Sequence, residues 1–104
     1  MADIPAPRRS RAPMHPGALL ADILPETGRT KIEIATLLGI SRQHLHDITT
    51  ERKPVSPHVA ARLGKMFGDG AAVWLRMQAA HDAWHAERDV DTSAIPTLRP
   101  VRAA

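Results

Sequence analysis

The stretch 29–54, RTKIEIATLLGISRQHLHDITTERKP, constrains the fold most, because it predicts two short helices joined by a tight turn. Thr30 is a favourable N-cap, and Glu33 three residues later completes a capping box that opens a helix ending at Leu38. Apolar residues recur at helical spacing inside this segment, so one side of the helix is predicted to face a core. Gly39 suits the turn that follows, because glycine adopts the left-handed backbone conformation without steric cost.

The second helix of this stretch is predicted to begin after Ser41, whose hydroxyl is a good N-cap. Leu45 and Ile48 are its only large apolar residues, so we expect them to anchor it to the core. The other side chains are hydrogen-bonding groups expected to point mostly outward: Arg42, Gln43, His44, His46 and Asp47. A helix with two apolar anchors and a polar face, placed after another helix and a tight turn, has the layout of a helix-turn-helix.

Three further helices are predicted outside this stretch, so the chain is expected to be all-α with five helices. They are expected at 16–24, 57–67 and 71–88. Both ends of the chain contain prolines and lack apolar periodicity. They therefore offer too little apolar surface for burial to offset the entropy lost when they are ordered. The predicted segments are a flexible basic arm at 1–15, one domain at 16–88 and a flexible tail at 89–104.

The last predicted helix carries an apolar seam with spacings of three, four and three residues, which is typical of a helix-packing stripe. The seam consists of Trp74, Met77, His81 and Trp84. It is more apolar than one small domain needs, which favours a dimer contact for these residues. The alternative is that the two tryptophans complete the core of their own domain. That alternative is favoured for Trp74, and both interpretations stay open for Trp84.

At 104 residues the chain has room for one domain, and its net charge of +3 is unevenly distributed. Residues 29–65 carry seven basic and three acidic side chains, and residues 1–16 carry three arginines and one aspartate. Positive charge concentrated in one part of a chain is typical of proteins that bind polyanions, although a solvated basic surface is the alternative. No apolar run is long enough for a signal peptide or a membrane span, so we expect a cytoplasmic protein.

Cysteine is absent, and the six histidines do not predict a metal site. His44 and His46 are two residues apart on a helix and so point to different faces. His81 and His85 are four apart, but no third ligand is placed beside them. The sequence has no glycine-rich phosphate loop, no Ser/His/acid constellation and no paired inward carboxylates. We therefore expect a binding protein without a metal, a cofactor or catalytic activity.

In a helix-turn-helix protein, the second helix lies in the major groove with its N-terminal residues at the base edges. Arg42 suits guanine O6 and N7, Gln43 suits adenine N6 and N7, and His46 lies one turn further on. The residues predicted to contact the DNA backbone are Thr30, Lys31, Ser41, His44, Arg52 and Lys53. For each residue, an exposed polar side chain without a partner is the alternative. The arm at 1–15 is a minor-groove contact, a partner contact or only a tail.

Four segments together resemble the HigA-type antitoxins, which are Xre-like helix-turn-helix proteins of bacterial toxin–antitoxin operons. They are HPG at 15–17, GISRQHLHDI at 39–48, ERKPVSPHVAARL at 51–63 and WLRMQAAHDAW at 74–84. The resemblance runs from His15 to Trp84, about two-thirds of the chain. The sequence departs from the family pattern at Lys31, where glutamine is common, at His81, where tyrosine is common, and at Ala83, where a larger apolar residue is expected.

The resemblance implies a lambda-repressor-like domain in a cytoplasmic bacterial homodimer, with the last helix in the dimer contact. It implies that the protein neutralises a HigB-like toxin of RelE fold that cleaves mRNA, and that it represses its own operon by binding double-stranded operator DNA. Arg42 and Gln43 match the base-reading residues of the family, and Trp74, Leu75 and Met77 match its last-helix anchor. Two alternatives stay open: a stand-alone Xre-like repressor without a toxin partner, and a protein-interaction module that no longer binds DNA.

Overall fold

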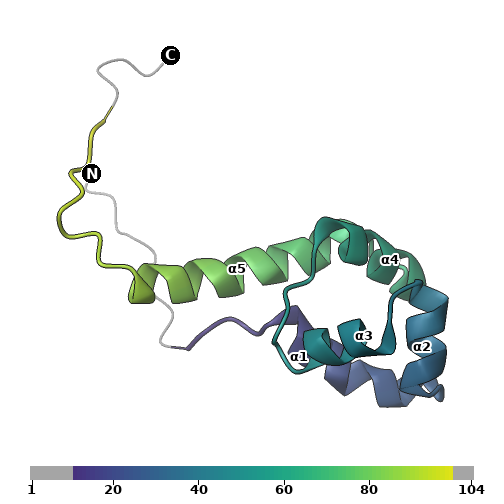
Figure 1. The fold of residues 1–104 in the computed structure, drawn as a ribbon. Coiled ribbons are helices and arrows are strands. Elements are labelled where there is room, and N and C mark those ends of the chain that lie inside the picture. Colours follow the sequence, from purple (N-terminus) through teal and green to yellow (C-terminus); the bar gives the residue numbers. More distant parts are fainter. Residues whose placement is uncertain (1–10, 100–104) are drawn as a thin grey trace.

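The computed structural model describes residues 11–99, which form five α-helices and one short 3-10 helix (Figure 1). They are α1 (Pro16–Ile23), η1 (Leu24–Thr27), α2 (Lys31–Leu38), α3 (Arg42–Thr49), α4 (Pro57–Phe67) and α5 (Ala71–Asp89). This part of the chain contains no strand, and the predicted all-α class is confirmed. α5 packs mainly on α4, and its C-terminal half extends away from the shorter helices (Figure 1).

The local signals that predicted the helix-turn-helix are present in the structure. Thr30 Oγ1 accepts the Glu33 N–H at 3.1 Å, and the Glu33 carboxylate accepts the Thr30 N–H, which completes the capping box. Gly39 ends α2 in the left-handed conformation with a φ of 72°. Ser41 Oγ then accepts the His44 N–H at 2.9 Å and caps α3. The predicted helix–turn–helix layout is therefore confirmed.

The two predicted anchors of α3 lie in the centre of the core. Leu45 and Ile48 are both 0% exposed, and they belong to the same buried cluster as Leu20, Leu63 and Trp74. Burying a side chain of this size stabilises a fold by about 1.5–3 kcal/mol. The two anchors therefore fix the rotation of α3 about its axis, which determines which of its side chains face solvent.

The start of the domain differs from the prediction. His15, expected in a flexible arm, is 5% exposed, and its Nδ1 accepts the Gly17 N–H at 2.8 Å to cap α1. Gly17 is required by close packing, because a Cβ at this position would run into the carbonyl oxygen of Ile48 in α3. The boundary of the predicted arm is therefore wrong at its last residue. Residues 1–10 of that arm lie outside the described residues.

The two other differences concern helix ends. The helix predicted at 16–24 ends at Ile23, and the next four residues form the 3-10 helix η1, in which the Thr27 hydroxyl donates to the Leu24 carbonyl at 2.7 Å. α5 ends at Asp89, one residue later than predicted. Beyond it, residues 90–99 contain no helix or strand, and residues 100–104 of the predicted tail lie outside the described residues.

The His15 cap predicts that the fold weakens in mild acid. Burial, followed by the nearby His81, lowers the pKa of His15 below its usual 6.5, although Glu51 and Asp82 act in the opposite direction. The folded state therefore binds a proton at His15 less readily than the unfolded state does. The stability that neutral His15 contributes to the fold is complete above pH 6.5 and is lost as the pH falls through and below that value. Protonation of Nδ1 also removes the acceptor for the Gly17 N–H.

Urea unfolding at pH 7.5 and pH 5.5 tests this expectation. We expect the midpoint of the wild-type chain to fall at the lower pH. His15→Asn keeps a side-chain cap but does not titrate, so it is expected to lose less stability over the same interval. An equal loss in both proteins would show that His15 is not responsible.

Candidate nucleic-acid interface

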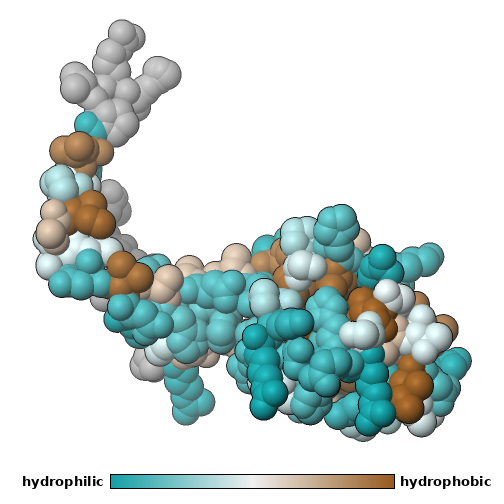
Figure 2. Space-filling view, in the orientation of Figure 1, coloured by the Kyte–Doolittle hydropathy of each residue, from teal (hydrophilic) through white to brown (hydrophobic). Residues whose placement is uncertain are grey.

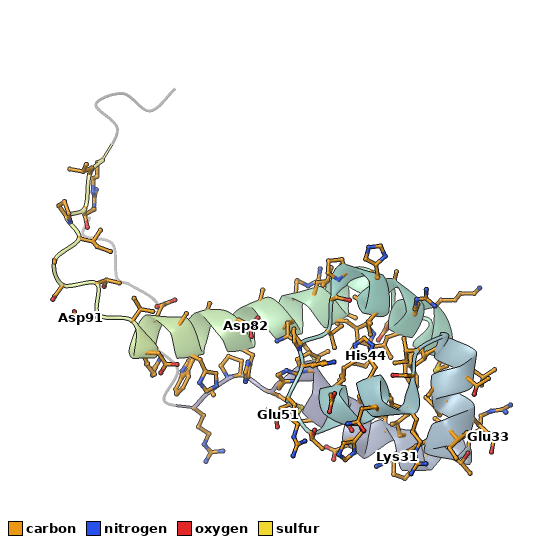
Figure 3. The ribbon with its side chains drawn as sticks, viewed as in Figure 1. Lys31, Glu33, His44, Glu51, Asp82 and Asp91 are labelled. Atoms are coloured by element: carbon orange, nitrogen blue, oxygen red, sulfur yellow. The ribbon has the colours of Figure 1, made fainter. Side chains whose placement is uncertain are left out.

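Four of the residues predicted to meet DNA line one surface hollow of about 530 Å³ between the start of α2 and the first turns of α3. We call it the recognition hollow, and its residues are Lys31, Arg42, Gln43 and His46. All four are exposed. The structure thus brings together the three predicted base-reading residues and one predicted backbone contact. The face of the helical domain seen in Figure 2 is largely hydrophilic, and Figure 3 labels Lys31 at the beginning of α2.

Two further basic residues follow α3 in an ordered loop. The N–H groups of Arg52 and Lys53 both donate to the carbonyl oxygen of Asp47, at 2.8 and 3.0 Å. Glu51, which precedes them, has a φ of 64° and is the one non-glycine residue with positive φ among the described residues. Since such a backbone conformation persists only where its surroundings hold it, the loop is fixed by α3. The exposed Arg52 and Lys53 are therefore held close to α3.

The remaining predicted backbone contacts have roles within the fold. The Thr30 hydroxyl accepts from the Glu33 N–H and donates to the Glu33 carboxylate at 3.2 Å. A phosphate would therefore compete with Glu33 for the hydroxyl proton of Thr30. Ser41 Oγ accepts the His44 N–H, which leaves its own O–H available to donate. His44 is half-buried, whereas His46 is exposed. Lys31, Ser41, Arg52 and Lys53 therefore have the most accessible donors.

Asp47, for which the sequence predicts an outward side chain and no role, is only 8% exposed, so the outward placement is wrong; it contacts Gln43 of the recognition hollow. Its Oδ1 accepts from Gln43 Nε2 at 2.9 Å, and its Oδ2 lies 3.6 Å from Lys53 Nζ. The hydrogen bond from Gln43, followed by the charge of Lys53, lowers the pKa of Asp47, so the carboxylate stays ionised at neutral pH. The four-residue spacing between Gln43 and Asp47 on one helix is the signal that could have revealed this pair.

On α5, the structure separates the four residues of the predicted seam. Trp74 is 1% exposed, its ring centroid lies 5.9 Å from that of Phe67, and its Nε1 donates to Asp69 at 3.0 Å. Its placement in a dimer contact is therefore corrected, because the side chain has almost no surface left for a partner. Met77 and Trp84 are half-buried. His81 is also half-buried, and its ring lies 4.8 Å from that of His15 in the same chain.

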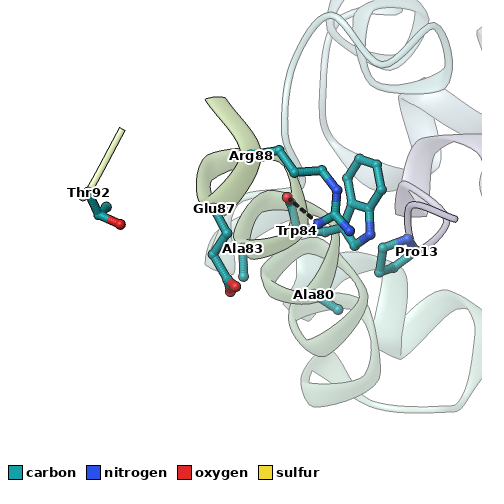
Figure 4. Close-up of a pocket in the computed structure, with 7 residues that line it drawn as sticks. All are labelled: Pro13, Ala80, Ala83, Trp84, Glu87, Arg88 and Thr92. Carbon is teal, nitrogen blue, oxygen red and sulfur yellow. Dashed lines mark hydrogen bonds between the residues drawn. The ribbon is translucent and has the colours of Figure 1, made fainter. Parts of the chain in front are cut away.

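Trp84 borders a hollow of about 360 Å³ near the end of α5 (Figure 4). The Arg88 guanidinium lies 3.6 Å from the centroid of the indole ring, a cation–π arrangement, and also donates to the Trp84 carbonyl at 3.2 Å. The other residues that line the hollow are Pro13, Ala80, Ala83, Glu87 and Thr92. This end of α5 thus combines a half-buried aromatic side chain with small neighbours.

The described residues show neither a cluster of metal ligands nor a membrane-spanning helix. Among residues 11–99, no three His, Cys, Asp or Glu side chains are grouped closely enough to hold a metal ion. In the same part of the chain, none of the helices combines the length and the apolar character that a bilayer crossing requires.

Comparison with known proteins places the chain among helix-turn-helix proteins. No family model matches it. It is 33% identical over 87 residues to virulence-associated protein I of Dichelobacter nodosus, a match that covers 83% of this chain and 81% of that protein. It is 32% identical over 84 residues to the helix-turn-helix-type transcriptional regulator YbaQ of Escherichia coli K12, and this match covers 80% of this chain and 74% of that protein.

Solved structures with the same architecture include complexes with DNA. A Pseudomonas aeruginosa protein in complex with its 28-bp operator DNA has a TM-score of 0.71 and 30% identity, and the match covers 83% of this chain and 99% of that chain. The Pseudomonas aeruginosa antitoxin HigA with the higBA promoter has a TM-score of 0.74 and 26% identity, covering 86% of this chain and 99% of that chain.

Proposed function

This chain belongs to the family of HigA-type antitoxins and Xre-like helix-turn-helix regulators, and on that premise we propose that it is an antitoxin that represses its own operon. The observation that carries the repressor half is the recognition hollow. There Lys31 of α2 is exposed beside Arg42, Gln43 and His46 of α3, the helix that Leu45 and Ile48 anchor in the core. The protein acts by binding and has no catalytic activity of its own.

In the proposed complex, α3 lies in the major groove of double-stranded operator DNA. Arg42 donates to guanine O6 and N7, Gln43 pairs with adenine N6 and N7, and His46 reaches a neighbouring base edge. Lys31, Arg52 and Lys53 neutralise phosphates and set the register of the protein on the duplex. Ser41 and His44 contribute from the start of α3.

The operator is bound by a homodimer. Two recognition helices then enter successive major grooves about 34 Å apart on a palindromic site. We place Met77, Trp84 and the exposed edge of His81 in the contact between protomers, because these α5 side chains keep accessible surface, and we leave Trp74 out of it. The hollow beside Trp84 is suited to a side chain of the partner.

The proposed toxin partner is a HigB-like protein of RelE fold that cleaves mRNA, and both proteins act in the cytoplasm. The family membership supports this half of the proposal, while the likeness to the regulator YbaQ favours a second candidate, a repressor without a toxin. Co-expression of the tagged full chain with the product of the neighbouring gene separates the two. Copurification supports the antitoxin, and its absence together with operator binding supports the stand-alone repressor.

We expect operator affinity to fall by about 10³-fold or more between 50 and 200 mM salt, because three basic residues per protomer contact phosphates and counterions are released. Lys31→Ala is expected to weaken binding to all sequences alike and to make the salt dependence shallower by about one phosphate contact per protomer. Fluorescence anisotropy with a labelled promoter duplex measures both effects. A salt dependence that is unchanged by Lys31→Ala would contradict the phosphate role of this residue.

A further inference from the structure

The orientation of the Gln43 side chain is set by the group that it contacts. Gln43 Nε2 lies 2.9 Å from Asp47 Oδ1. An ionised carboxylate only accepts hydrogen bonds, so the NH₂ group of the amide must face Asp47 and the amide oxygen must face away. The reversed amide would place two acceptors against each other. Asp47 therefore gives an exposed, otherwise rotatable amide one preferred orientation.

We propose that Asp47 is a positioning residue that orients the Gln43 amide so that Gln43 selects adenine over guanine in the major groove. This inference rests on the proposed operator binding. With one N–H directed to Asp47, Gln43 still offers its Oε1 acceptor and its second N–H donor to a base. Adenine presents a donor at N6 and an acceptor at N7, which match this pair. Guanine presents two acceptors, O6 and N7, so its O6 would meet the amide oxygen.

The surroundings of Asp47 favour such a role. Asp47 is 8% exposed, and Lys53 Nζ lies 3.6 Å from the second oxygen of its carboxylate. The charge of Lys53 balances that of the carboxylate beside the polyanion. The carbonyl oxygen of Asp47 accepts the N–H groups of Arg52 and Lys53, which carry proposed phosphate contacts. Asp47 therefore links the side chain that reads a base to the loop that sets the register on the backbone.

Selection from a random-sequence duplex library with the full-length chain tests the proposal, with the base frequency at each position as the readout. Gln43→Ala identifies the base pair that Gln43 reads, because the preference at that position is lost. In Asp47→Asn, the new side chain both donates and accepts, so either orientation of the Gln43 amide is satisfied. We expect the adenine-over-guanine preference at that position to fall about fivefold or more, while the other positions keep theirs.

α5 provides a matched control. Gln78 Nε2 donates to Asp82 Oδ1 at 2.9 Å, also with a spacing of four residues, on a helix away from the recognition hollow. Asp82→Asn is therefore expected to leave every base preference unchanged. Asp47→Ala removes the acceptor without adding a donor and should relax the same position as Asp47→Asn.

Two outcomes would overturn the inference while leaving the proposed function intact: an unchanged adenine preference in Asp47→Asn and Asp47→Ala, or an equal loss of preference at every position. A wild-type chain that enriches no motif would instead overturn operator binding, and the role of Asp47 with it. Thermal unfolding of each variant shows whether a general loss of preference comes from a loss of fold.

Discussion

Arg42→Ala is expected to weaken specific operator binding strongly while the protein remains folded. A bidentate arginine–guanine pair contributes about 1–3 kcal/mol of discrimination against other bases. The substitution removes one such pair from each protomer of the dimer, so operator affinity should fall about 30-fold or more. Arg42 is exposed in the recognition hollow and follows the Ser41 cap, so its removal leaves no cavity in the core. The unfolding free energy should therefore change by no more than about 0.5 kcal/mol.

Anisotropy titrations with a labelled promoter duplex measure this effect. Arg76→Ala is the matched control, because it removes one exposed arginine from α5, outside the recognition hollow. It should retain nearly all specific affinity at the same salt concentration. Equal affinities of Arg42→Ala and the wild-type protein would remove Arg42 from base reading.

Gly17→Ala should have the largest effect on stability. The added Cβ would meet the carbonyl oxygen and carbon of Ile48 and the imidazole of His15, and backbone atoms cannot rotate out of the way as a flexible side chain can. α1 would have to move away from α3, which disturbs both the His15 cap and the packing around Ile48. We expect a loss of about 3 kcal/mol or more, a large share of the stability of a small domain.

Urea unfolding of the full chain measures this loss. Asp22→Ala places an alanine on the exposed side of the same helix, and its midpoint should stay close to that of the wild type. A wild-type midpoint for Gly17→Ala would mean that α1 and α3 do not approach as closely as described.

The features that could be predicted from sequence are those encoded within a few residues. The capping box of Thr30 and Glu33 and the turn at Gly39 define helix ends through local hydrogen bonds and backbone geometry. Leu45 and Ile48, three residues apart, place one side of α3 in the core, so most of its polar side chains face outward, although Asp47 is only 8% exposed. The exposed positions of Arg42, Gln43 and His46 follow from that local pattern.

Features that depend on distant contacts could not be predicted in the same way. His15 is buried partly because the ring of His81, 66 positions later, packs against it. Gln78 is 7% exposed and accepts the Val55 N–H at 2.8 Å, a bond that joins α5 to the segment before α4. Neither burial leaves a periodic signal in the sequence. The pair Gln43–Asp47 is different, because its spacing was visible, but an outward polar face gave no indication that the two side chains bind each other.

Titration of the ¹⁵N-labelled full chain with its promoter duplex, followed by amide chemical shifts, tests most directly whether the exposed face of α3 binds DNA. We expect the largest changes in amide chemical shift at Lys31, in Arg42–His46 and at Arg52 and Lys53. Amides in the second half of α5 should change little, because the dimer is formed before DNA is added. Saturable binding with its largest shift changes elsewhere, and with Arg42–His46 unaffected, would show that α3 is not the DNA-binding helix.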